Sequence, residues 1–337
     1  MQKHVLVIGS TGAMGRHLVP ELVKLGYKVT GVSLDVPQDP VPGVTYYTGD
    51  CFDKEFLASL LEKKFDGVVN FMYFGAKNPW SEYMKLFLDN TDHYIFLSSC
   101  RVYADEEVPV KETSPRLLDV SKDEALLAST DYCIMKAKCE DMLWNSAYNN
   151  FTIVRPATTF SEMRYQLVTL EAKNTVGRAV KGKKVIVPIQ AKDKPATLCW
   201  GGDVAKMIAR LMFKKEAMRE AYNVCSSESR TWGEIADYYK QICGLEAVWV
   251  DKEDYLKLIS TNGVVTPGTR WQLEYARLFH RVTDNSKMLA VTGLKQEEFM
   301  SLYDALKMMI DAVPEGYEFP DTPTGARMDQ YLEEHGL

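Results

Sequence analysis

Short apolar runs alternate with longer amphipathic patterns along the first 160 residues of the chain. Most of these runs are continuous, which is typical of parallel strands buried on both faces of a sheet. Stretches with helical spacing separate them. The runs that indicate strands are His4–Ile8, Tyr27–Ser33, Val44–Thr48, Phe65–Met72 and His93–Ser99. This succession predicts an α/β fold with a doubly wound parallel sheet.

The turn after the first strand is rich in glycine. Gly9, Gly12 and Gly15 are spaced so that one permits a tight turn, one lets backbone approach a pyrophosphate, and one lets the following helix pack closely. A plain glycine-rich turn is the alternative, but the flanking strand and helix favour a dinucleotide site. The contacts expected here come from Gly9, Thr11, Gly12, Ala13, Met14 and Gly15.

An acidic residue follows the second strand. Asp35 lies 20 residues beyond Gly15 and can accept hydrogen bonds from ribose hydroxyls. The stretch from there to Gly43 contains no Lys or Arg to neutralise a 2′-phosphate, which favours NAD and leaves NADP open. Asp50 comes just after a strand and is either a cofactor contact or a residue at a helix N-terminus.

Tyr-x-x-x-Lys occurs three times, at Tyr73/Lys77, Tyr132/Lys136 and Tyr303/Lys307. Only the middle pair lies in a helical region, Ser121–Ala147, that follows a strand ending in serines. In that region Tyr132, Lys136 and Glu140 are four residues apart and share one helix face. Tyr73 closes a strand, and Tyr303 falls in an amphipathic helix where an aromatic is more often part of the core.

Composition and charge disfavour several kinds of partner, location and cofactor. A net charge of −6 without a basic cluster disfavours nucleic acid and anionic membrane as partners. The first strand starts at His4, and no apolar run approaches the ~20 residues of a membrane span, so we expect a cytoplasmic protein. Seven dispersed cysteines indicate reduced thiols, and the five histidines lack metal-ligand spacing, so we expect no metal.

Five motifs occur in a fixed order: Gly9-x-x-Gly12-x-x-Gly15, Gly49-Asp50-x-x-Asp53, Leu97-Ser98-Ser99-x-x-Val102-Tyr103, Tyr132-x-x-x-Lys136 and Arg155-Pro156. Together they resemble the extended short-chain dehydrogenase/reductase family, specifically its NAD-dependent sugar-nucleotide epimerase/dehydratase branch. The resemblance continues to Asp284-Asn285-Ser286-Lys287 and so covers most of the chain. It implies a Rossmann-type fold and an epimerase that acts on a nucleotide sugar by transient hydride transfer. The alternatives are a net NAD(P)-dependent reductase or dehydrogenase, and a non-catalytic nucleotide-sensing protein.

The resemblance also assigns roles. Ser99 would be the hydroxyl that orients the substrate, Tyr132 the acid/base and Lys136 the cation that favours its phenolate and holds the nicotinamide ribose. Ser33, Cys51, Phe71, Met72 and Pro156 join the expected cofactor contacts. Counted without a gap, the family's ribose-binding acid falls on Ser33, with Asp35 two residues later on the same strand face if the strand persists.

We expect a Rossmann domain formed by 1–160 plus about 201–225, and a discontinuous substrate-binding domain formed by about 161–200 and 226–337. The segment between Phe71 and Ser98 has one brief helix where the family has a long dimer helix, so a homodimer is doubtful.

A sugar nucleotide also needs cations for its pyrophosphate. The candidates for substrate contact are Arg101, Thr158, Arg178, Lys194, Arg270 and Arg281. If the chain is extended after Ser99, Arg101 enters the same crevice while Cys100 points to the opposite face. Arg101 would then grip an acidic sugar or, alternatively, turn outward to Asp105, Glu106 or Glu107.

Overall fold

The computed structural model describes residues 2–337, which form two compact units. Unit 1 runs to Thr159 and adds Gly201–Ser226 and Thr283–Phe299. Unit 2 consists of Phe160–Trp200, Ser227–Val282 and Met300–Leu337. In this division the segment 283–299, which we expected in the second domain, belongs to unit 1.

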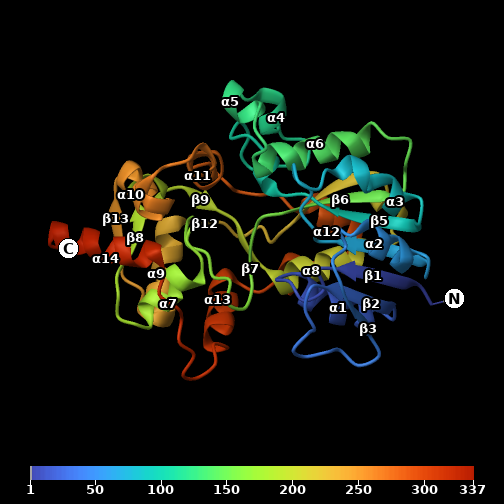
Figure 1. Cartoon of the computed structure of the whole chain (residues 1–337), viewed down its shortest axis with the longest axis horizontal. Coiled ribbons are helices and arrows are strands. Elements are labelled where there is room, and N and C mark those ends of the chain that lie inside the picture. Colours follow the sequence, from blue (N-terminus) through green and yellow to red (C-terminus); the bar gives the residue numbers. More distant parts are fainter. Residues whose placement is uncertain (1) are drawn as a thin grey trace. The chain divides into compact units, whose positions relative to one another are not determined.

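Unit 1 is built on a seven-stranded parallel sheet with the order β11-β6-β5-β4-β1-β2-β3 (Figure 1). The strands are β1 (His4–Ile8), β2 (Lys28–Ser33), β3 (Thr45–Thr48), β4 (Phe65–Asn70), β5 (Thr91–Leu97), β6 (Phe151–Pro156) and β11 (Glu220–Val224). Ile8, the last residue of β1, pairs with both Val32 and Asn70. The strand order therefore reverses beside β1, and the doubly wound Rossmann-type sheet predicted from the sequence is confirmed.

Helices cover both faces of this sheet, as Figure 1 shows. Leu18, Val19 and Leu22 bury one side of α1 (Gly15–Lys24), which packs against α8 (Gly201–Leu211). The opposite face carries α2 (Lys54–Leu61), α3 (Met84–Leu88) and α6 (Tyr132–Trp144) over a separate apolar cluster. The remaining helical segments of unit 1 are η1 (Trp80–Glu82), η2 (Cys100–Val102), α4 (Leu117–Val120), α5 (Glu124–Leu127), η5 (Lys215–Ala217), α12 (Ser286–Thr292) and η8 (Gln296–Glu298).

The long helix expected over Ser121–Ala147 is wrong, because the chain breaks it at residues 128–131. Ser129 Oγ accepts a hydrogen bond from the amide of Asp131, and Asp131 caps the next helix by accepting from the amide of Cys133. These short side-chain contacts to the backbone compete with helix continuation and favour a new N-terminus. Tyr132 is consequently the first residue of α6 rather than a mid-helix position.

The segment Thr283–Phe299 packs on unit 1 because its backbone and side chains bond there. Asn223 Nδ2 donates to the carbonyl of Asp284 at 3.0 Å, and Lys287 Nζ donates to Glu220 at 2.6 Å and to the carbonyl of Ala221 at 3.0 Å. Helix α12 accordingly contacts β11 and α8. Hydrophobic patterning gives no sign of such a return to the sheet.

Unit 2 has its own core, with Trp232, Tyr239 and Tyr255 among its fully buried aromatics. Its strands are β8 (Val185–Pro188), β9 (Pro195–Ala196), β10 (Leu198–Trp200), β12 (Arg230–Thr231) and β13 (Ala247–Val250), while β7 (Thr158–Phe160) spans the boundary with unit 1. Its helical segments are η3 (Ala172–Asn174), α7 (Val176–Ala179), η4 (Ile189–Ala191), α9 (Trp232–Cys243), α10 (Lys252–Ile259), η6 (Thr261–Gly263), α11 (Pro267–Gln272), η7 (Leu273–Arg277), α13 (Leu302–Asp311) and α14 (Pro323–His335). Strands β8 and β13 pair in parallel, and β9 and β12 pair antiparallel.

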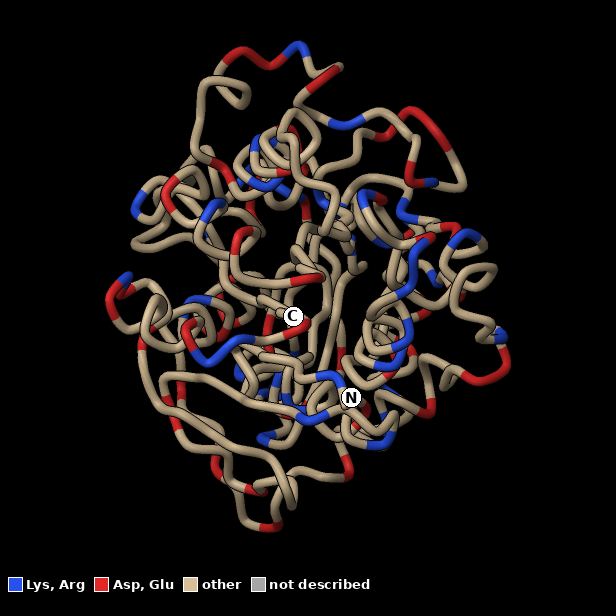
Figure 2. The backbone as a smooth tube through the Cα atoms, turned by 90° about the vertical axis from the view of Figure 1, so that its right-hand side faces the viewer, with Lys and Arg blue, Asp and Glu red and all other residues tan. Residues whose placement is uncertain are grey.

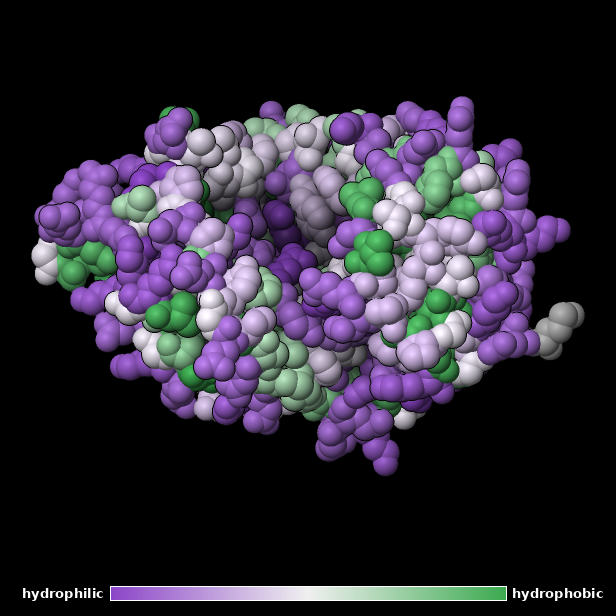
Figure 3. Space-filling model, turned by 60° about the horizontal axis from the view of Figure 1, so that its bottom comes forward, coloured by the Kyte–Doolittle hydropathy of each residue, from purple (hydrophilic) through white to green (hydrophobic). Residues whose placement is uncertain are grey.

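Charges of both signs are interspersed along the chain, as Figure 2 shows. On the face seen in Figure 3, hydrophobic residues form small patches among hydrophilic ones. Over residues 2–337, no helix combines the length and the apolar character that a bilayer span requires. The seven cysteines are free thiols, and only Cys243 is not fully buried.

Candidate active site

The turn between β1 and α1 has the shape of an anion cradle. Gly9 adopts φ +82°, and a Cβ on Gly15 would lie 2.0 Å from the carbonyl oxygen of Gly9. Helix α1 has no side-chain cap, and within residues 2–337 the amides of Ala13 and Met14 have no protein acceptor. Free amides at a helix N-terminus, approached by side-chain-free backbone, are what a dinucleotide pyrophosphate requires. The turn therefore fits the expected cofactor.

The two candidates for the ribose-binding residue have different surroundings. Ser33 ends β2 and is buried, and its Oγ accepts from the amide of Thr11 at 3.0 Å and lies 3.2 Å from Ser10 Oγ. The strand does not persist to Asp35, contrary to the expected shared face, and the Asp35 carboxylate is exposed beside Thr11, whose Oγ1 donates to it at 2.6 Å. Of the two, Asp35 is the one whose acceptor atoms remain accessible.

The remaining cofactor candidates lie at the carboxyl ends of β1, β3 and β4. Phe71 donates its amide to the carbonyl of Ile8, and its Cβ lies 3.2 Å from where a Cβ on Gly9 would stand, so it borders the cradle. Met72 is held by a hydrogen bond from its backbone amide to Asn70 Oδ1. Asp50 accepts from the amide of Phe52, while Asp53 is the residue that caps α2.

Two more cofactor candidates are buried. Burial raises the pKa of the Cys51 thiol to about 12. The thiol therefore stays protonated and unreactive, and the side chain packs as an apolar group. Pro156 ends β6, where it pairs with Val224, and Thr158 begins β7 two residues later.

The serine-bearing end of β5 turns immediately. Ser99 Oγ accepts from the amide of Arg101 at 3.2 Å, and Cys100–Val102 form one 3₁₀ turn. The extended segment assumed for Cys100 and Arg101 is therefore wrong, and strand alternation does not decide where these side chains point. Arg101 instead donates from Nη2 to Asp131 at 3.3 Å, and its guanidinium carbon lies 5.2 Å from the ring centre of Tyr132.

Tyr132 and Lys136 lie one helical turn apart at the start of α6. Lys136 is 1% exposed, donates to the carbonyl of Leu97 at 2.5 Å, and has its Nζ 5.7 Å from the ring centre of Tyr132. Burial lowers the pKa of Lys136 to about 8. Phe96 and Tyr73 also border the ammonium group, at 5.2 and 5.6 Å, and the Tyr73 ring stacks on Tyr132 with centroids 5.1 Å apart. Tyr73, which the sequence pattern predicts only as the end of a strand, is thus part of this site.

A buried charge network behind the site was not predicted from the sequence. Glu140 is fully buried and accepts from Arg155 Nε at 2.8 Å and Nη2 at 2.7 Å, from Ser98 Oγ at 2.5 Å and from Arg116 at 3.2 Å. Burial by itself raises the pKa of Glu140. The opposing effect of Arg155, Ser98 and Arg116 is larger, so the pKa is lowered overall and the carboxylate stays ionised. Arg155 also donates to Tyr103. The helix face shared by Lys136 and Glu140 was the one available signal.

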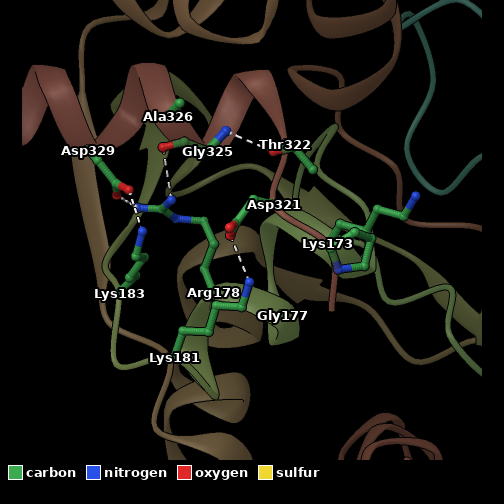
Figure 4. Close-up of a pocket in the computed structure, with 11 residues that line it drawn as sticks. Lys173, Gly177, Arg178, Lys181, Lys183, Asp321, Thr322, Gly325, Ala326 and Asp329 are labelled. Carbon is green, nitrogen blue, oxygen red and sulfur yellow. Dashed lines mark hydrogen bonds and ion pairs between the residues drawn. The ribbon is translucent and has the colours of Figure 1, made fainter. Parts of the chain in front are cut away.

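The four candidate cations of unit 2 do not gather at one place. Arg178 is buried, and its Nε donates to the carbonyl of Lys184. Its two other guanidinium nitrogens bind α14, through the carbonyl of Gly325 and the carboxylate of Asp329 (Figure 4). The cavity beside it, about 190 Å³, is bordered by two further ion pairs, Lys181–Asp321 and Lys183–Asp329 (Figure 4).

The other three cations of unit 2 divide into a pair and a single residue. Arg270 forms a two-pronged ion pair with Glu253, with both distances 2.7 Å. Lys194 and Arg281 share one neighbourhood, where the Arg281 amide bonds to the carbonyl of Pro195 and Lys194 Nζ lies 3.2 Å from His280. Of the four candidates, Lys194 and Arg281 are the two whose backbone positions the Arg281–Pro195 hydrogen bond brings together.

The sheet order and the glycine cradle place unit 1 in the Rossmann class of folds, and the cradle has the geometry that suits a dinucleotide pyrophosphate. More particularly, residues 5–91 match the model of the NAD dependent epimerase/dehydratase family. The resemblance found in the sequence is confirmed over the segment that carries the cradle, and NAD is the cofactor of that family of enzymes. No curated protein matches the chain.

Solved structures share the fold. UDP-glucuronic acid 4-epimerase from Bacillus cereus, crystallised with UDP-glucuronic acid and NAD, is 17% identical with a TM-score of 0.67, covering 93% of this chain and 100% of that chain. UDP-glucose 4-epimerase from Thermus thermophilus, in complex with NAD, is 18% identical with a TM-score of 0.64 and covers 93% of this chain and 100% of that one. Epimerase Mth375 from Methanothermobacter thermautotrophicus is 16% identical, with a TM-score of 0.65 and coverage of 99% and 94%.

Proposed function

We propose that this protein is an NAD-dependent epimerase of a nucleotide sugar that inverts a carbinol centre by transient oxidation. The observation that carries the proposal is the grouping of Ser99, Tyr132 and Lys136 in unit 1, with the lysine ammonium 5.7 Å from the tyrosine ring. Similarity in fold to epimerases of UDP-sugars supports the substrate class. Bound NAD supplies the reversible two-electron acceptor for the substrate carbon.

Tyr132 takes the hydroxyl proton of the substrate and returns it after the oxidised sugar has presented its other face. A phenol has an ordinary pKa of about 10, so this role requires a neighbouring positive charge that favours phenolate. Lys136 supplies that charge at neutral pH, because even its lowered pKa, about 8, leaves it mostly protonated there. Its bond to the carbonyl of Leu97 fixes the ammonium in place.

Ser99 orients the oxygen that loses its proton. Its Oγ already accepts from the amide of Arg101, which leaves the hydroxyl hydrogen free to donate to the substrate. The glycine cradle, Asp35 and Phe71 are the residues that would hold the cofactor. Lys194 and Arg281 are the candidates for the substrate pyrophosphate, because the hydrogen bond from the Arg281 amide to the carbonyl of Pro195 brings these two positions together along the backbone.

Incubation with a panel of UDP-, dTDP- and GDP-sugars, neutral and uronic, tests the proposal. An epimerase interconverts two sugars while bulk NADH stays constant, whereas a net reductase or dehydrogenase consumes or accumulates NADH. Absence of any conversion across the panel would refute the substrate class. Tyr303→Phe is the matched control for Tyr132→Phe, since Tyr303 begins the same Tyr-x-x-x-Lys spacing on α13.

A further inference from the structure

The aromatic ring of Tyr132 lies beside one member of an ion pair, Arg101–Asp131. The Arg101 guanidinium carbon is 5.2 Å from the ring centre, and the same guanidinium donates to Asp131, the residue that precedes Tyr132. Both side chains are largely buried, with 15% of Arg101 and 9% of Asp131 exposed. Their interactions with Tyr132 are therefore screened less by solvent than those of a surface pair.

Asp131 cannot move away from Tyr132, because its carboxylate caps α6 by accepting from the amide of Cys133 at 3.0 Å. A fixed negative charge beside a phenol disfavours the phenolate. The cap that starts the helix at Tyr132 thus works against the ionisation that the proposed acid/base role needs. A compensating cation is required, and Arg101 lies against both groups.

The other titratable groups around Tyr132 provide this compensation only in part. Lys136 supplies a positive charge at neutral pH, but Glu140 follows on the next turn of the same helix face, and burial lowers the pKa of Lys136 to about 8, so its charge is lost as the pH rises through that value. Tyr73, from the loop after β4, stacks on the ring, and burial raises the pKa of its phenol, so it stays neutral. Cys133 stays a neutral thiol, because burial raises its pKa to about 12. A guanidinium keeps its charge over the whole working pH range.

We propose that Arg101 is a positioning residue for Tyr132, which stabilises the ionised phenol by cancelling the charge of Asp131 and placing its own beside the ring. Arg101 also joins the two elements that carry the proposed hydroxyls, since its amide bonds to Ser99 and its guanidinium to the cap of α6. The use of this arrangement in turnover rests on the proposed function, but the ionisation of Tyr132 can be measured without substrate.

The test is a pH titration of the whole protein labelled with isotopic tyrosine, followed by NMR, with the Tyr132 signal identified by its loss in Tyr132→Phe. Arg101→Gln should raise the pKa of Tyr132 by about 1–3 units, the range for losing an adjacent opposite charge. Asp131→Asn, which keeps a good helix cap, should lower it. The double variant should return it close to the wild-type value, because both charges are gone.

Arg101→Lys should retain much of the effect, and it keeps the test available if Arg101→Gln does not fold. Glu106→Gln, a change at an exposed carboxylate in the loop after η2, is the control and should leave the signal unmoved. An unchanged Tyr132 titration in Arg101→Gln would overturn the inference, as would a double variant that titrates like Arg101→Gln alone. If the titrations behave as expected but no sugar nucleotide turns over, the proposed function fails and this inference stands.

Discussion

Replacement of Glu140 by Gln tests whether the buried charge network holds unit 1 together. The carboxylate is fully buried and receives two bonds from Arg155, whose side chain is 4% exposed. Gln has the same shape but presents an NH₂ group to one arm of the guanidinium. Arg155 then remains buried without an opposite charge, and Ser98 and Arg116 lose a charged acceptor.

The expected loss follows from this geometry. Removing one partner of a buried ion pair costs about 3–5 kcal/mol, mostly because the remaining charge is left uncompensated. In a unit of about 200 residues, each kcal/mol corresponds to roughly 2–4 °C in Tm. We therefore expect Tm to fall by roughly 6–20 °C.

Urea titration and thermal melting at pH 7 measure this loss. Asp141→Asn is the matched control, because Asp141 is the next residue, pairs with Arg116 at 2.7 Å and is 38% exposed, so its removal should cost about 0–1 kcal/mol. Equal losses for the two variants would refute the reasoning that burial of Glu140 sets the cost.

The pH dependence has a defined sign. The pKa of Glu140 is lower in the folded protein than in the unfolded chain, so its contribution is complete above about pH 5 and disappears as pH falls through the folded value. The gap in stability between the wild type and Glu140→Gln should therefore close at acid pH. A gap that is independent of pH would contradict an electrostatic origin.

The remaining predictions concern the cradle and the proposed catalytic residues. Tyr132→Phe should lower turnover by about 10²–10⁴-fold with unchanged NAD affinity by calorimetry, while Tyr303→Phe stays active. Gly15→Ala, whose Cβ would meet the carbonyl of Gly9 at 2.0 Å, should abolish NAD binding in the same calorimeter, whereas Gly268→Ala, with open space around it, should bind normally. Lys136→Met should be inactive yet more stable at pH 7 by about 1–3 kcal/mol. The pKa of Lys136 falls from its ordinary value of 10.5 to about 8 in the folded protein because burial disfavours the charged form, and Met removes that unfavourable buried charge. Wild-type stability measured by urea should rise from pH 8 to 10 through this group, and Lys136→Met should not show that rise.

The sequence by itself determined the doubly wound parallel sheet of unit 1, because local patterns carry that information. Continuous apolar runs separated by helical spacing fix parallel strands, and β1 was predicted with the bounds it has, His4–Ile8. The glycine spacing determined the cradle, since only residues without Cβ fit at Gly9 and Gly15. The order of motifs along the chain also singled out Tyr132/Lys136 among three equal matches.

The tertiary structure decided which charges meet. Whether Arg101 paired with the acidic loop that follows it or entered the crevice could not be read from alternation, because the chain turns at Cys100 and delivers the guanidinium to Asp131, 30 residues away. The break before Tyr132 depends on a cap, Asp131, whose effect is local but weaker than the helical pattern that surrounds it.

The same holds for the buried network and for Thr283–Phe299. Glu140 and Arg155 come from a helix and a strand that only the packed sheet brings within 2.8 Å, and the pairing of two charges 15 residues apart leaves no periodic trace in a sequence. Hydrophobic periodicity reports which face of an element is buried, but not which buried polar group it will find there. That choice is made by the geometry of packing, which is why the fold could be predicted from the chain alone and the electrostatics of its site could not.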